Sequence, residues 1–140
     1  MEYHDGKDLI VARLHQDEDL FESLTKICTE AKLAFGIVIS GIGMLKQVQL
    51  NYFMKKGEYS ELFFAEPMEL VSIAGNIMLL DGEYNFHLHA VLARSNKEAV
   101  AGHLAKGKVN VTNEIVILKT DVPASRKLDQ ATGLLALTFK

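Results

Sequence analysis

Several features that would assign this 140-residue chain to a special class are scarce or missing. It contains one cysteine, two prolines and no tryptophan. A single cysteine, Cys28, cannot form a disulfide within the chain and excludes a zinc site built from several thiolates. Two prolines with ten glycines exclude a collagen-like or low-complexity chain. The remaining composition, 49% hydrophobic and 24% charged, is typical of a globular protein and predicts one domain over residues 1–140.

The sequence also lacks an excess of positive charge and any long apolar run. Its formal net charge of -3 gives no general attraction to nucleic acid or to an anionic membrane. The longest apolar runs, at 35–39 and 73–80, are too short to span a bilayer. The first residues lack the basic segment and apolar run of a signal peptide. We therefore expect a cytoplasmic protein with no membrane partner.

The N-terminal quarter predicts a strand followed by one helix. The strand is expected over the apolar run 9–14. Asp19, with Glu22 three residues later, has the pattern of a capping box and predicts the helix start. Apolar residues then recur with the spacing of one buried helical stripe: Leu20, Phe21, Leu24, Ile27, Cys28, Ala31 and Ala34. Because the cysteine belongs to this stripe, we interpret it as a packed thiol rather than a nucleophile.

The rest of the chain predicts strands joined mostly by short turns. A turn is expected at 40–43, a hairpin turn at 55–58, and a bulge or bend at Gly75-Asn76 inside a long strand. The strands are predicted over 35–39, 45–53, 59–64, 68–80, 84–93, 109–118 and 134–139. One helix and about seven strands favour an α+β domain built on a largely antiparallel mixed sheet.

Three histidines carry the strongest chemical signal. His87 and His89 are two residues apart in the strand predicted over 84–93, so they project from one face, opposite its apolar face. His103 follows after one turn and returns beside them if that turn is a hairpin. Three neutral imidazoles suit Zn²⁺, with Ni²⁺ and Fe²⁺ as alternatives, and leave a position for water, substrate or a carboxylate. The alternative interpretation is a group of structural histidines.

Four further polar residues are candidates for a site. Glu69 is either a structural residue, in an edge salt bridge or at an exposed strand end, or a site carboxylate that moves a proton or serves as a fourth metal ligand. Asn76 is either a bulge residue or a group that orients a ligand near the metal. Arg94 and Arg126 are the candidate anion-binding residues, and the sequence does not distinguish between them.

Several motifs, in this order and spacing, resemble the plant-and-prokaryote conserved domain, called PPC or PCC and formerly DUF296, a domain of unknown function. They are Ser-Gly-Ile-Gly at 40–43, the strand sequence at 67–77, His-Leu-His-Ala at 87–90, Gly-His-Leu at 102–104 and the strand at 111–117. The resemblance implies an α+β fold similar to that of acetolactate decarboxylase, assembled as a homotrimer. It also implies zinc binding by His87, His89 and His103.

Two positions depart from the family pattern. Ala101-Gly102 replaces a glycine pair before the third histidine, which should leave a metal site intact. The AT-hook of the plant relatives is missing, and the basic residues are neither abundant nor clustered. We therefore expect no DNA binding by this chain alone, although prokaryotic members are often described as DNA-binding.

The sequence is compatible with three functions. The first is that of a metal-binding protein with a regulatory role exerted through a small-molecule ligand or a partner. Alternatively, the chain is a metal-dependent enzyme of the lyase or hydrolase type that acts on a small polar substrate with Glu69 as the assisting base. The third possibility, suggested by the plant relatives, is a DNA-associated module.

Overall fold

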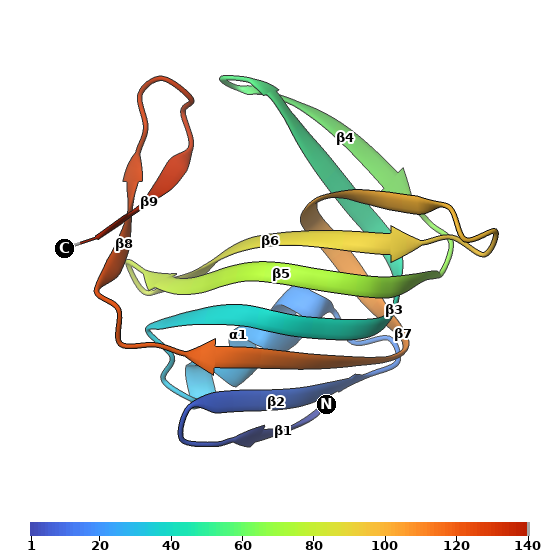
Figure 1. Ribbon diagram of the computed structural model, residues 1–140, viewed down its shortest axis with the longest axis horizontal. Coiled ribbons are helices and arrows are strands. Elements are labelled where there is room, and N and C mark those ends of the chain that lie inside the picture. The colour runs from blue at the N-terminus through green and yellow to red at the C-terminus, as the bar shows by residue number, and fades with distance from the viewer. Residues whose placement is uncertain (140) are drawn as a thin grey trace.

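The computed structural model describes residues 1–139 and contains one helix and nine strands (Figure 1). In chain order they are β1 (Glu2–Asp5), β2 (Leu9–His15), α1 (Leu20–Glu30), β3 (Phe35–Lys55), β4 (Glu58–Phe64), β5 (Met68–Leu80), β6 (Glu83–Ala93), β7 (Ala99–Lys119), β8 (Ala124–Leu128) and β9 (Leu135–Phe139). Seven strands form one sheet in the order β1-β2-β7-β6-β5-β3-β4, and β8 and β9 form a separate hairpin.

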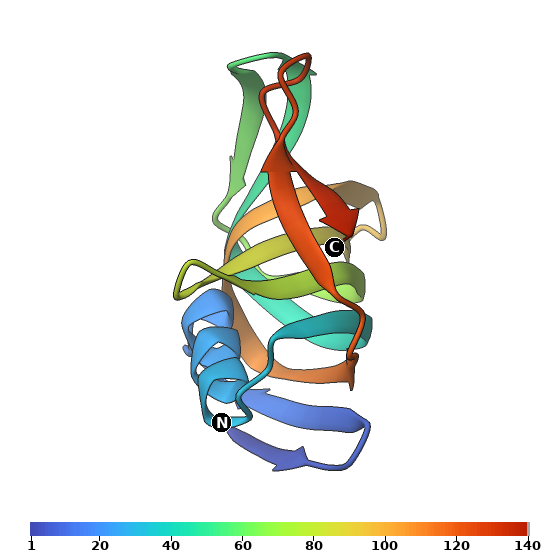
Figure 2. The ribbon, with the colours of Figure 1, turned by 90° about the vertical axis from the view of Figure 1, so that its left-hand side faces the viewer.

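The predicted α+β class with a seven-stranded sheet is confirmed. Within residues 1–139 every pairing between named strands is antiparallel, so the sheet is not mixed. The two longest strands organise it, because β7 pairs with β2, β6 and β3 while β3 also pairs with β5. The strands β3, β5, β6 and β7 therefore close into a ring, and α1 packs alongside it (Figure 2).

The helix begins where the sequence predicts. The Asp19 carboxylate accepts hydrogen bonds from the backbone N–H groups of Phe21 and Glu22, at 2.9 and 3.1 Å. These bonds satisfy two donors that the first helical turn leaves free. The predicted stripe is wrong only at its end, because the helix stops at Glu30 and Ala34 is exposed. Among residues 1–139, no helix has the length and apolar character needed to cross a membrane.

Cys28 is a packed thiol, as predicted. Its side chain is fully buried in the core with the apolar face of α1. Burial raises the pKa of this thiol to about 12, because the thiolate is disfavoured in an apolar environment. The Tyr84 hydroxyl lies 2.7 Å from the Cys28 carbonyl oxygen and joins the helix end to β6.

The turn predicted at 40–43 is wrong, because β3 continues through this segment. The register of β3 against β7 shifts before Ser40 and again after Gly43, which accommodates the irregular sequence inside one long strand. Gly43 has a φ of +136°, and a Cβ there would lie 2.1 Å from the Thr112 carbonyl oxygen. The glycine thus permits close contact between two strands rather than a reversal of the chain.

The bulge predicted at Gly75-Asn76 is also wrong. The pairing of β5 with β6 runs without interruption through both residues, and its register shift lies between Leu70 and Ser72. Gly75 has a φ of +148°, and a Cβ there would lie 1.9 Å from the His87 carbonyl oxygen. This glycine allows β5 and β6 to approach each other directly beside His87.

The C-terminal segment lies outside the main sheet. The strand predicted over 134–139 forms β9, which pairs with β8 instead. β8 was not predicted, because Ala-Ser-Arg-Lys-Leu shows no apolar alternation. Figure 1 shows this hairpin beside the ends of β5 and β6 that are joined by the Asp81-Gly82 turn. Its tip contacts the β3–β4 turn, where Lys56 Nζ donates to the Gln130 carbonyl oxygen at 2.7 Å.

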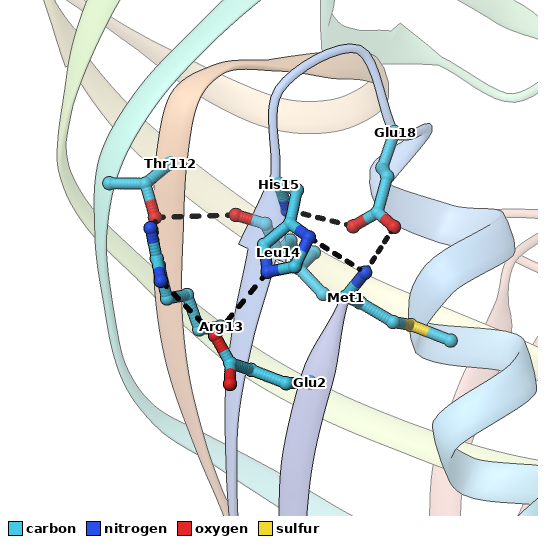
Figure 3. A network of polar contacts seen from close by, with 7 residues as sticks. All are labelled: Met1, Glu2, Arg13, Leu14, His15, Glu18 and Thr112. Atoms are coloured by element: carbon cyan, nitrogen blue, oxygen red, sulfur yellow. Dashed lines mark hydrogen bonds and ion pairs between the residues drawn. The ribbon is translucent and has the colours of Figure 1, made fainter.

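A polar network joins the N-terminal hairpin to the start of α1 (Figure 3). The Glu18 carboxylate pairs with the amino group of Met1 and accepts a 2.7 Å hydrogen bond from the His15 N–H. Arg13 pairs with Glu2 at 3.1 Å on the neighbouring strand. Partial burial disfavours the Glu18 charge, but its two partners outweigh this, so its pKa lies below the ordinary 4.5.

Candidate metal centre

The structure brings the three predicted histidines together. The ring centroids of His87 and His89 are 5.2 Å apart, and each lies 5.6 Å from the ring of His103. One nitrogen from each ring can be chosen so that all three lie within 4.8 Å of one another. Such a group is the expected donor set for a transition metal.

Strand register explains why the rings meet. His87 and His89 alternate with the buried Leu88 and Ala90 along β6, so both project from the face that is not packed on the core. The turn after β6 is a hairpin, and the resulting register sets His89 directly opposite His103 on β7. Residues directly opposite each other project from the same face of a sheet, so the third ring joins the other two.

The surroundings favour neutral rings at two of the three positions. Partial burial lowers the pKa of His87, and the neighbouring His89 and Arg126 add to this. Burial likewise lowers the pKa of His103, with further contributions from His87 and His89. Since metals bind the neutral imidazole, these environments suit ligand binding.

The residues present fit a zinc ion. Two nitrogens bound to one tetrahedral Zn²⁺ are separated by roughly 3.3 Å, so the rings need only small rotations from their present spacing. In the described chain, no Asp or Glu carboxylate joins the three rings as a further candidate metal ligand. The set of three neutral donors therefore leaves a coordination position for an external group.

Glu69 lies away from the three rings. In β5 it pairs with Ala93, whereas Ala74 pairs with His89, so five residues separate Glu69 from the level of the rings. At about 3.3 Å per residue this is roughly 17 Å along the strand. Glu69 is exposed and lines a shallow surface hollow with Ile42 and Glu114.

The two candidate arginines differ in position. Arg94 is exposed and pairs with Glu66 at 2.9 Å, away from the rings. Arg126, on β8, donates through Nη2 to Asn76 Oδ1 at 2.5 Å, and Asn76 is directly opposite His87. The structure therefore places Arg126 and Asn76 beside the three histidines. The sequence analysis named Asn76 as a group near the metal and Arg126 as one of two anion-binding candidates, but the contact between them was not predicted because β8 is distant in the chain.

Asn51 is another polar neighbour that the sequence analysis missed. It is directly opposite His103 where β3 pairs with β7, and Gln49 Nε2 donates to its Oδ1 at 3.1 Å. The polar residues at 49 and 51 alternate along a predicted strand, and this was the signal available in the sequence.

Comparison with known proteins matches most of the chain to one domain family. The profile of the Plants and Prokaryotes Conserved (PCC) domain matches residues 1–121. The bifunctional protein GlmU of two Synechococcus strains, JA-2-3B'a(2-13) and JA-3-3Ab, is 30% and 31% identical over 128 and 127 residues. In both cases the match covers 89% of this chain but 19% of the relative, so the chain spans about a fifth of the length of these proteins.

Solved structures resemble the whole chain. A candidate DNA-binding protein from Bacteroides thetaiotaomicron matches with a TM-score of 0.91 and 27% identity, covering 99% of this chain and 96% of its own. The metal-containing protein from Archaeoglobus fulgidus matches with a TM-score of 0.83 and 25% identity, covering 98% of this chain and 96% of its own. A PPC protein from Pyrococcus horikoshii matches with a TM-score of 0.81 and 27% identity, covering 96% of this chain and 94% of its own.

The family profile covers most of the chain and contains all three histidines of the cluster. This chain belongs to the PCC domain family.

Proposed function

We propose that this protein binds one Zn²⁺ per protomer through His87, His89 and His103 and uses the remaining coordination position to bind a small polar ligand. One observation carries the proposal, namely that three imidazole nitrogens lie within 4.8 Å of one another on an uncovered sheet face. The similar protein from Archaeoglobus fulgidus is described as metal-containing, which supports a metal at this position. Ni²⁺ and Fe²⁺ are the alternative occupants.

The ligand-binding role follows from the number of donors. Structural zinc sites are usually closed by four protein ligands, whereas sites that bind water or substrate keep one position open. A zinc ion held here supplies Lewis acidity, and the chain supplies three neutral donors. We propose that the role is regulatory, in the cytoplasm, with the ligand as the signal.

The protein is further proposed to act as a homotrimer with a fold related to that of acetolactate decarboxylase. Exposed apolar side chains on the strands of the main sheet support self-association, because a contact between protomers would remove their apolar surface from water. They include Ile37, Ile39, Ile42, Val71, Val91 and Val111.

A metal-dependent lyase or hydrolase is the second candidate function, and the open coordination position favours it. Glu69, the proposed assisting base, lies too far along β5 from the rings to serve them within one protomer. We therefore rank enzyme activity below ligand binding.

A direct role in DNA binding has the least support. The relative from Bacteroides thetaiotaomicron is described as a candidate DNA-binding protein. The net charge of this chain is -3, which provides no general attraction to phosphates.

Metal analysis of the purified protein tests the main proposal. Wild type should contain about one zinc per chain after dialysis against zinc and removal of the excess. His89→Ala should lose most of this metal, while the control His4→Ala, which changes an exposed histidine on β1, should retain it. Equal metal contents in wild type and His89→Ala would contradict the site.

A further inference from the structure

The C-terminal hairpin places a positively charged side chain beside the three histidines. Arg126 on β8 donates to Asn76 Oδ1 at 2.5 Å and to the Leu135 carbonyl oxygen on β9 at 2.9 Å. The first bond attaches the guanidinium to β5, and the second fixes it against its own hairpin. Asn76 and His87 are cross-strand partners, whose Cβ atoms are typically about 5 Å apart.

Arg126 retains unused donors and an unbalanced charge. A guanidinium has five N–H donors, and the contacts to Asn76 and Leu135 use two of them. Its Nε is buried without a hydrogen-bond partner. Within residues 1–139, no carboxylate forms an ion pair with Arg126, whereas Arg94 is paired with Glu66.

The charges that can be assigned to the centre, a bound divalent ion and Arg126, are both positive. Imidazoles bind a metal in the neutral form and no carboxylate joins the three rings in the described chain, so a bound divalent ion would keep its full charge. Arg126 adds a second positive group on the same face. A positively charged site with unused hydrogen-bond donors favours a negatively charged ligand.

We infer that the ligand of this site is a small molecule with an oxyanion group, a carboxylate or a phosphate, which Arg126 would hold beside the metal carried by the three histidines. This inference rests on the proposed metal site and specifies what occupies its open position. The amide N–H groups of Asn76 are further donors for the same group, because its oxygen is already engaged by Arg126.

The hairpin that carries Arg126 is held at two places. Besides the contact to Asn76, its tip is attached to the β3–β4 turn through Lys56 and the Gln130 carbonyl oxygen. It also lies beyond residue 121, outside the segment that matches the PCC profile. The anion-binding group is thus supplied by a part of the chain separate from the strands that carry the histidines.

Cobalt substitution tests the inference directly. The visible absorption of Co²⁺ bound to the full-length protein reports exchange at its open position, and acetate and inorganic phosphate are titrated separately as probes. Arg126→Gln should weaken binding of the preferred anion by about tenfold or more, which is the scale of a lost charged hydrogen bond. The matched control Arg94→Gln should leave the affinity within about twofold of wild type.

A second variant separates the loss of the anion contact from a folding defect in Arg126→Gln. Arg126→Lys keeps the positive charge without the planar guanidinium and should bind the anion with an intermediate affinity. The anion with the larger dependence on Arg126 identifies the group as carboxylate or phosphate. Unchanged anion affinity in both Arg126 variants, with cobalt still bound, would overturn the inferred role of Arg126 but not the proposed metal site. Failure of the wild type to bind cobalt would instead overturn the proposed metal site.

Discussion

His89 and His103 face each other directly across β6 and β7, and this pairing brings the third ring to a face already occupied by two. The relationship depends on strand register. A shift of one residue in the hairpin would turn His103 to the opposite face of the sheet. The candidate metal centre therefore depends on the same backbone pairing that folds the domain.

Zinc should stabilise the folded protein through this pair. A ligand that binds only the folded state at a hundred times its Kd adds about 2.7 kcal/mol, which corresponds to a rise in Tm of about 5–10 °C for a chain of this size. We expect this rise for wild type on adding zinc and its reversal by a chelator, measured by differential scanning calorimetry. His103→Ala should show neither effect, and a zinc-dependent rise of equal size in this variant would contradict the assignment.

Gly75→Ala should destabilise the protein strongly. Its added Cβ would lie 1.9 Å from the His87 carbonyl oxygen, and its φ of +148° is unfavourable for alanine. We expect a loss of about 2–4 kcal/mol in the free energy of unfolding, measured by urea denaturation. Zinc affinity should also fall, because the clash displaces β6 beside His87.

Gly82→Ala is the matched control for this effect. Gly82 also has a positive φ, +88°, but a Cβ there meets no atom within 4 Å. Its loss should be confined to backbone strain, roughly 1 kcal/mol, with zinc affinity unchanged. Equal losses in the two variants would show that the close approach of β5 and β6 is not important for stability.

Cys28 should react slowly with thiol reagents in the native protein. Its side chain is buried, and its pKa of about 12 leaves very little thiolate at pH 8. We expect labelling by a chromogenic disulfide to be limited by unfolding, and to become fast in denaturant. Rapid stoichiometric labelling of the folded protein would show that the core around α1 opens readily.

Glu18 should make stability depend on pH in the acid range. Its pKa is lowered in the folded protein by the Met1 amino group and the His15 N–H, against the effect of partial burial. The stabilisation is therefore complete above the ordinary pKa of 4.5 and is lost as the pH falls through the lower folded-state value. Glu18→Gln should flatten this part of the stability profile measured by denaturation between pH 6 and 3, at about half-unit steps. The control Glu61→Gln, at an exposed position on β4, should keep the wild-type slope.

Local patterns were sufficient to predict much of the fold and the three histidines. Asp19 marked the helix start because a capping side chain acts within a few residues. His87 and His89 were assigned to one face because strand alternation is a local property. The approach of His103 required only one hairpin, so a short-range argument also reached it.

The errors arose where distant segments determine the backbone. Gly43 and Gly75 were interpreted as turn and bulge residues, although each is needed for contact with another strand. Nothing within 40–43 indicates that β7 will pair along its length. The position of Arg126 beside Asn76 was inaccessible for the same reason, because the two residues are 50 positions apart.

The β8–β9 hairpin and the closed ring should differ in how freely they can change. The strands that carry the histidines are part of the ring, so substitutions there affect the fold as well as the candidate metal centre. The hairpin pairs only with itself among the named strands, and it can change sequence or length at little cost to the ring. A change in the hairpin would therefore alter the surroundings of the candidate metal centre while the strands that carry the three histidines stay in place.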